Sequence, residues 1–199
     1  NKIVKNKRKQ FKNEIYWGKP ITGFGDPKGK ILFVGLAPAA HGGTRTGRVF
    51  TGDKSSDFLY KCLFNAKISN QSTSDHINDG LKLKNAFITP ALKCVPPEDK
   101  PLKIELDNCS KFFNNELKIL KNLKVVVALG KIAFDTCKIF YSEKFEIPRN
   151  VKFGHGNIFK LKNGVNLVGC YHPSPRNVNT GRINEKMMSQ LFQKVKRLD

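Results

Sequence analysis

Residues 31–53 read ILFVGLAPAAHGGTRTGRVFTGD, an apolar run that leads directly into a basic, glycine-rich turn. A short apolar run bounded by turn residues is typical of a strand that is buried on both faces of a parallel sheet. The turn contains His41, Arg45 and Arg48, and its first carboxylate is Asp53 at the last position. Because open α/β sheets bind ligands beyond the carboxyl ends of their strands, this turn is the first candidate for a site.

Three further runs of β-branched or aromatic residues predict buried strands at 85–89, 124–129 and 165–170, in addition to the strand at 30–34. Apolar residues at helical spacing separate these runs. The helical segments are 55–63, 106–120, the residues after 130, and 183–195. Strands that alternate with helices predict one α/β domain over residues 1–199, with three α/β/α layers around a central four-stranded parallel sheet.

The composition indicates a nucleic-acid partner. Lysine and arginine number 36 against 16 acidic residues, a formal net charge of +20. Such an excess attracts a polyanion before any specific contact forms, although a lysine-rich solvated surface is the alternative. No apolar stretch is long enough to cross a bilayer, so we expect an intracellular monomer, cytoplasmic or nucleoid-associated, with no membrane partner.

The N-terminal segment 1–13 contains six lysines and arginines and no acid. It is either a nucleic-acid arm or a solvated terminus. The first residue is Asn1 and not Met, so we expect the segment to be truncated upstream. The five cysteines are an odd number without a secretory context, which argues against a disulfide framework and leaves metal binding or burial.

Several common sites are excluded by missing residues. A phosphate-binding loop needs Gly-Lys followed by Ser or Thr, but Gly47 precedes Arg48 and Val49. The dinucleotide pattern GxGxxG and the hydrolase pattern GxSxG do not occur. Only Cys94 and Cys109 have a spacing and flanks that suggest metal ligands, and two ligands do not complete a zinc site.

A rigid loop, HPSPRN at residues 172–177, follows the last predicted strand. Pro173 and Pro175 fix the backbone, so the loop protrudes stiffly with His172 at its base and Arg176 near its tip. Such a protrusion is suited to wedging into a stacked duplex.

Four motifs together carry a family resemblance. They are YWGKPITGFGDP at 16–27, the turn at 35–53, KCVPPEDKP at 93–101 and YHPSPRNVNTGR at 171–182. In this order and spacing the chain resembles family 5 of the uracil-DNA glycosylase superfamily. The resemblance implies a monofunctional DNA glycosylase of base excision repair, which flips a base out of the duplex and hydrolyses its N-glycosidic bond to leave an abasic site. The rival interpretations are a non-catalytic iron–sulfur DNA-binding module and a nucleotide hydrolase.

The resemblance also implies roles for individual residues. His172 would donate a hydrogen bond to the departing uracil, and Asp53 would orient water or stabilise the cationic sugar, with helix capping as its alternative role. Phe50 would stack on the flipped base, unless it belongs to the core. The implied substrate-binding residues are Gly35, Ala37, Ala39, His41, Phe50, Asp99 and Asn177. The implied DNA-binding residues are Arg45, Arg48, Arg176 as the wedge, and Arg182.

Two positions affect the expected substrate range. Ala37 stands where other families of the superfamily have Asp or Asn, and the resemblance then implies hypoxanthine and xanthine as substrates beside uracil, in double- or single-stranded DNA. Asp99 departs from the family, which commonly has Asn there.

The family carries a four-iron, four-sulfur cluster held by four thiolates. Cys94 and Cys109 match two ligands, and the other two are expected upstream of residue 1. Cys62, Cys137 and Cys170 match no ligand position and are expected to be buried.

Overall fold

The computed structural model describes residues 2–142, 147 and 151–199, except for the side chains of Lys2 and Asp99. Its centre is a six-stranded sheet with the order β1-β3-β2-β4-β6-β5. The four inner strands are parallel to one another, and the two edge strands are antiparallel to their neighbours. The strands are β1 Phe24–Gly25, β2 Ile31–Gly35, β3 Ala86–Pro90, β4 Val125–Leu129, β5 Ile158–Lys160 and β6 Asn166–Cys170.

The predicted four-stranded parallel sheet is therefore incomplete. The inner strands are the four that were predicted. The sheet also contains the edge strands β1 and β5, which were not predicted, and it is mixed because both are antiparallel to their neighbours. These edge strands have two and three residues and are only partly buried, so they lack the long apolar run that marks a central strand.

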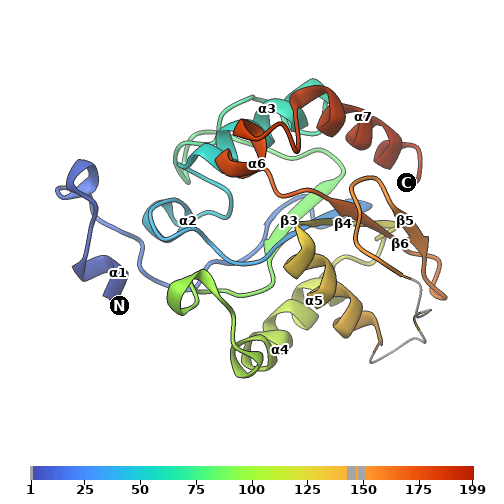
Figure 1. Cartoon of the computed structure of the whole chain (residues 1–199), viewed down its shortest axis with the longest axis horizontal. Coiled ribbons are helices and arrows are strands. Elements are labelled where there is room, and N and C mark those ends of the chain that lie inside the picture. Colours follow the sequence, from blue (N-terminus) through green and yellow to red (C-terminus); the bar gives the residue numbers. More distant parts are fainter. Residues whose placement is uncertain (1, 143–146, 148–150) are drawn as a thin grey trace.

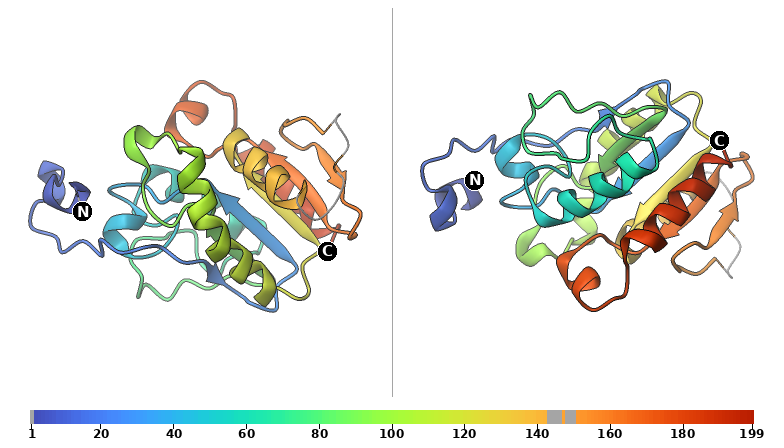
Figure 2. Two further views of the ribbon diagram at one scale, coloured as in Figure 1. Left: turned by 90° about the horizontal axis from the view of Figure 1, so that it is seen from below. Right: turned by 90° about the horizontal axis from the view of Figure 1, so that it is seen from above.

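Helices cover both faces of the sheet (Figure 1). Helices α3 (Lys54–Asn65) and α7 (Glu185–Lys196) lie on one face, and α4 (Lys103–Ile119) and α5 (Lys131–Ser142) lie on the other. Figure 2 shows the two helical layers from opposite sides. The three layers that the sequence predicted are thus present. Short helices fill the connections: α1 Lys2–Lys5, η1 Lys9–Phe11, α2 Gly43–Thr46, η2 Pro97–Asp99 and α6 Pro175–Asn179.

The alternation along β2 explains the two cores. Ile31 and Phe33 pack into the cluster under α3 and α7, whereas Leu32 and Val34 pack into the cluster under α4 and α5. Successive side chains of a strand point to opposite faces, so an apolar run of consecutive residues can serve both layers. No helix among the described residues has the length and apolar character needed to span a membrane.

Candidate active site

The unusual loops of the sequence follow β2, β3 and β6, all of which are parallel. Their carboxyl ends therefore meet at one edge of the sheet. The short helices α2 and α6 belong to two of these loops and lie at this end of the molecule (Figure 1). The candidate site is built at this edge.

Phe50 and His172 lie together there although 122 positions separate them in the sequence. Their ring centroids are 6.2 Å apart, with planes inclined by 36°. Phe50 is partly exposed and packs against the edge of the core. It therefore contributes to the core, as one alternative predicted, and its partial exposure is compatible with the other, stacking on a base. Its φ of +47° is rare for an aromatic residue, and strain of this kind is concentrated at functional sites.

The Phe50 ring packs directly against Gly35 at the end of β2. A Cβ atom at position 35 would lie 2.7 Å from the Phe50 ring, closer than side chains tolerate. Glycine at the end of β2 therefore lets the aromatic ring approach the strand, and the substrate-binding role predicted for Gly35 stays a prediction.

His172 lies at the base of the loop after β6, where its ring is largely surrounded by protein. Burial lowers the pKa of His172 to about 4, so the imidazole is neutral near pH 7. A neutral ring keeps one N–H and can donate a hydrogen bond without placing a positive charge in the site.

The loop after β6 is held by its own polar groups. The Nδ2 atom of Asn177 donates to the carbonyl of His172 over 2.9 Å. Ser174 caps α6 by accepting a hydrogen bond from the Asn177 N–H. Asn177 therefore fixes the backbone of His172.

Asp53 is the N-cap of α3. Its Oδ1 atom accepts from the N–H groups of Ser55 and Ser56 at 2.8 and 3.0 Å, and the Asp53 N–H donates to the Ser56 hydroxyl in a capping box. The capping role proposed for Asp53 is thus present. Oδ2 points toward Gly42, where any Cβ atom would overlap it.

Burial raises the pKa of Asp53, although the two N–H groups of α3 act in the opposite direction. A carboxylate with one oxygen held by a helix and a raised pKa is oriented and more basic than an exposed one. It lines a hollow of about 620 Å³ together with Ala39, His41 and Gly42. Among the described residues, those lining this hollow do not include Phe50 or His172.

His41 is held by aromatic neighbours. Its Nδ1 atom lies 2.7 Å from the Tyr16 hydroxyl, and the rings of Phe11 and Tyr16 pack against the imidazole. Burial, with Arg8 and Arg45 nearby, lowers the pKa of His41. Burial also raises the pKa of Tyr16.

Arg48 is buried among protein partners, so its guanidinium is not free to bind DNA as the sequence predicted. Its side chain is 3% exposed and forms a bidentate ion pair with Asp79 at 2.6 and 2.8 Å. Further hydrogen bonds bind its guanidinium to Ser74 and Thr51. All of its nitrogen atoms therefore have protein partners, and Arg48 ties the turn to the loop before β3.

Arg45 is also engaged by protein groups. It donates to the carbonyls of His41 and Gly52 at 2.8 and 2.9 Å, pairs with Glu14 at 2.6 Å and lies over the Phe11 ring. The Arg45 side chain is only 13% exposed, and it lines the hollow beside Asp53. Its main structural role is to hold the turn against the N-terminal segment.

Arg176 and Arg182 are exposed on the loop after β6. Arg176 is in the first turn of α6, and no other described residue pairs with its guanidinium. Arg182 lies over the ring of Tyr171, with 4.7 Å from Cζ to the centroid. Their placement leaves both available to phosphate.

Ala37 is partly exposed just beyond β2, so no side-chain amide or carboxylate is present at that point of the edge. Asp99 belongs to η2, but its side chain is outside the described part of the structure.

Cys94 is exposed and Cys109 is partly buried. Partial burial raises the pKa of the Cys94 thiol, and Cys109 acts on it in the same direction. Among the described residues, no three His, Cys, Asp or Glu side chains are arranged to hold a metal ion. Cys94 follows β3 and Cys109 lies on α4, and together they provide two of the thiolates that a four-thiolate set requires. Burial of Cys62, Cys137 and Cys170 is confirmed.

Sequence reasoning missed His155. Its Nδ1 atom accepts from the Tyr171 N–H over 3.2 Å, and Nε2 lies 3.4 Å from the carbonyl of Met187. His155 thereby joins α7 to the root of the loop that carries His172. A single histidine between two glycines gives no motif signal, so only the fold could reveal this role.

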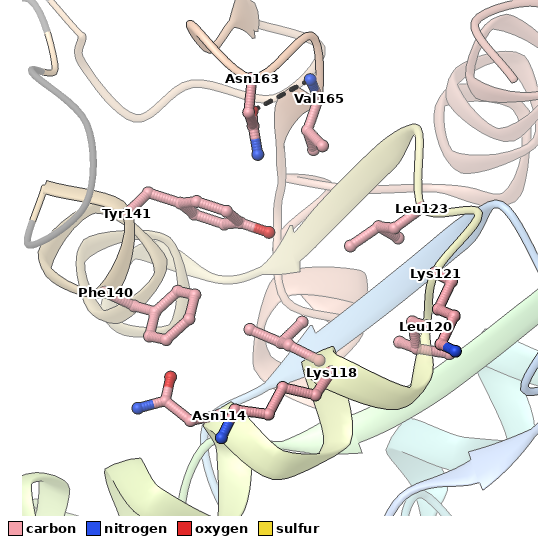
Figure 3. Close-up of a pocket in the computed structure, with 10 residues that line it drawn as sticks. Asn114, Lys118, Leu120, Lys121, Leu123, Phe140, Tyr141, Asn163 and Val165 are labelled. Atoms are coloured by element: carbon pink, nitrogen blue, oxygen red, sulfur yellow. Dashed lines mark hydrogen bonds between the residues drawn. The ribbon is translucent and has the colours of Figure 1, made fainter.

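A different hollow, of about 360 Å³, lies at the other end of the sheet (Figure 3). Side chains of α4, α5 and the turn before β6 line it, and Asn163 accepts there from the Val165 N–H. None of the predicted site residues is among those that line it. The predicted site residues therefore lie away from this hollow.

The sequence profile of the Uracil DNA glycosylase superfamily matches residues 22–196, and the chain belongs to it. A solution NMR structure of a protein from Methanosarcina acetivorans has a TM-score of 0.55, at 12% identity over 90% of this chain and 98% of that one. That likeness supports the fold alone.

Curated relatives narrow the family. Type-5 uracil-DNA glycosylase of Thermus thermophilus is 40% identical over 98% of this chain and 87% of the relative. The type-5 proteins of Pyrobaculum aerophilum and Mycobacterium bovis are 38% and 40% identical, over 94% and 96% of this chain and 79% and 71% of theirs. Within the superfamily the chain is a member of the type-5 group, which confirms the resemblance carried by its motifs.

Proposed function

We propose that this chain, as a DNA glycosylase of the type-5 group, excises uracil from DNA by hydrolysing the N-glycosidic bond. The observation that carries the proposal is the neutral imidazole of His172 beside the Phe50 ring at the carboxyl edge of the sheet. Together these side chains provide a stacking surface and a hydrogen-bond donor for one flat base.

The reaction begins with the base outside the duplex, because the glycosidic bond cannot be reached within the stack. Arg176, exposed at the first turn of α6, is placed to enter the vacated space. Phe50 then stacks on the base. Its position is fixed by the close approach to Gly35, so little freedom is lost when the base arrives.

As the glycosidic bond breaks, negative charge develops on the uracil oxygens and positive charge on the sugar. His172 donates its N–H to the uracil oxygen, which a preorganised donor in a dry site can favour by roughly 3 kcal/mol. Because the ring is already neutral, the leaving group receives a hydrogen bond and not a full proton.

Asp53 acts at the sugar. Its Oδ2 atom stabilises the cationic sugar or orients the attacking water, while Oδ1 stays bound to the N–H groups of α3. The hollow of about 620 Å³ beside it can supply that water. With alanine at position 37, no second polar side chain assists from the end of β2.

The same absence supports a broader substrate range. A side-chain amide at position 37 would read the edge of one base, whereas Ala37 offers no such discrimination. We include hypoxanthine and xanthine among the substrates on this basis.

Cys94 and Cys109 would hold two irons of a four-iron, four-sulfur cluster, with the other two ligands from outside residues 1–199. The group would supply structure by tying the loop after β3 to other parts of the protein. Lys93 anchors that loop, because its buried ammonium pairs with Glu116 at 2.6 Å and donates to the carbonyl of Pro90. Iron and sulfide analysis of the full-length protein, with Cys94→Ser and Cys109→Ser beside it, tests this assignment.

The function is tested with end-labelled duplexes that carry one uracil or one hypoxanthine, incubated with the protein in EDTA and then treated with alkali. Alkali-dependent cleavage at the modified base is expected. Salt-sensitive binding without any cleavage would instead identify a non-catalytic DNA-binding module. Cleavage at uracil but not at hypoxanthine would rule out the broader substrate range and would still support the uracil activity.

A further inference from the structure

A groove of about 630 Å³ lies between residues 14–19 and the loop at 76–78. We call it the Trp17 groove; Ile15, Trp17, Lys19, Arg45 and Ile77 are among its lining residues. Arg45 also lines the hollow beside Asp53. The Trp17 groove and that hollow therefore lie on either side of the Arg45 side chain. Figure 1 shows the N-terminal segment, in blue, running alongside α2 at this end of the molecule.

The Trp17 groove exposes apolar side chains that a protein normally buries. Ile15 is 95% exposed, Trp17 is 44% exposed and Ile77 is 41% exposed. They come from two loops and line one hollow. Grouped apolar exposure of this kind, in contrast to isolated exposed residues, marks a binding surface.

Trp17 is held firmly in this position. Its N–H donates to the Arg45 carbonyl over 3.0 Å, the next N–H donates to Thr44 over 3.1 Å, and the indole N–H lies 3.4 Å from the Pro20 carbonyl. A Cβ atom at Gly47 would lie 3.2 Å from the indole, so the ring rests on a glycine whose φ of +88° also favours that residue. The groove thus has a preorganised aromatic surface.

The charge of the groove favours an anionic partner. Glu14 is neutralised by its ion pair with Arg45 at 2.6 Å. The Lys19 ammonium lies 5.4 Å from the Trp17 ring centroid, and no described carboxylate pairs with it. A fixed aromatic face beside a mobile cation matches a nucleotide, which has a flat base for the ring and a phosphate for the cation.

We propose that the Trp17 groove binds one unstacked base of the substrate DNA next to the flipped nucleotide, with Trp17 as the stacking surface and Lys19 on the phosphate. This inference rests on the proposed function for the identity of the DNA. It adds a second base-binding position, distinct from the one proposed at Phe50 and His172. Stacking contributes without sequence preference, because every base has an aromatic face.

The test uses the intrinsic fluorescence of the unaltered protein, because Trp17 is the only tryptophan in the sequence. The probe is a duplex that carries a tetrahydrofuran abasic analogue, and binding is followed in parallel by the anisotropy of labelled DNA. Saturable quenching of Trp17 at the anisotropy midpoint, with protection from acrylamide, is expected. Full binding with unchanged emission and unchanged acrylamide access would overturn the proposal.

Variants give an independent test. Trp17→Leu is expected to bind the probe about tenfold more weakly, because the stacking of one base on the indole is lost. Phe112→Leu is the matched control, because Phe112 is 51% exposed on α4 and also has a lysine over its ring, with Lys111 Nζ 5.2 Å from the centroid. Equal affinities of the two variants would count against the groove. Lys19→Gln, which keeps the Trp17 ring but removes the charge, is expected to lower the salt dependence of binding.

The outcomes separate this inference from the proposed function. If uracil is excised but Trp17 does not respond to DNA, the function stands and the groove assignment fails. If the protein neither binds DNA nor excises uracil, both fail. If Trp17 emission changes with protein concentration in the absence of DNA, and sedimentation shows a dimer, the groove binds a second copy and the DNA assignment is wrong.

Discussion

The ring centroids of Phe50 and His172 lie 6.2 Å apart, although Phe50 follows β2 and His172 follows β6. Parallel strands bring both residues to the same edge, since every such strand ends there. Burial makes the imidazole neutral and the strained backbone of Phe50 directs its ring. The proposed function therefore assigns base recognition and leaving-group stabilisation to the same small region.

His172→Ala should lower uracil excision about a hundredfold, because a preorganised donor to developing charge is removed. Single-turnover rates at saturating protein measure this, with the affinity for abasic-analogue DNA expected to stay the same. Full excision activity in His172→Ala would contradict the mechanism.

Asp53→Asn separates the two roles of Asp53. Asparagine is an equally good N-cap, so the free energy of unfolding should change by less than about 1 kcal/mol. The excision rate should nevertheless fall strongly, because the charge at Oδ2 is lost. Urea denaturation and single-turnover assays on the same preparation give both quantities.

The comparison variant is Asp53→Ala, which should also lose about 0.5–2 kcal/mol of stability with the cap. If Asp53→Asn retains the excision rate of the unaltered protein, Asp53 serves only α3.

Arg48→Met should destabilise the protein by about 1–3 kcal/mol, because the partly buried Asp79 carboxylate loses its bidentate ion pair but keeps three backbone N–H donors. Arg176→Ala, at an exposed position, should leave stability within about 0.5 kcal/mol and weaken DNA binding instead. Thermal unfolding and the salt dependence of DNA affinity distinguish the two. An Arg48→Met protein with normal stability and a reduced salt slope would restore the DNA-binding role predicted for Arg48.

The stability should fall as the pH drops from about 6.5 to about 4. His172 has a pKa lowered from 6.5 to about 4 in the folded state, so the unfolded chain binds more protons in this window. Unfolding is therefore favoured as the pH falls, by at most about 1.4 kcal/mol per pH unit for one histidine. Burial lowers the pKa of His155 in the same direction.

Denaturant midpoints across this pH range measure the effect. His172→Gln should have a smaller slope, since the proton uptake of one histidine on unfolding is removed. An unchanged slope in His172→Gln would show that His172 is not the group responsible.

Much of the fold could be predicted because its signals are local. The four inner strands are continuous apolar runs, and β2 supplies both cores from consecutive residues. Edge strands β1 and β5 were missed because two or three partly buried residues carry no such signal. His155 was missed for a related reason, since its partners Tyr171 and Met187 are distant in sequence.

The sequence by itself determined the layer architecture, the order of the loops at the carboxyl edge and the family, because each depends on residue types at short spacing. Only the tertiary structure decided what individual polar side chains do. Arg48 is buried because Asp79 meets it from another loop, Asp53 divides its oxygens between α3 and the hollow, and Trp17 stays exposed on Gly47. These roles follow from charge pairing, desolvation and close approach between distant segments, which residue order alone does not specify.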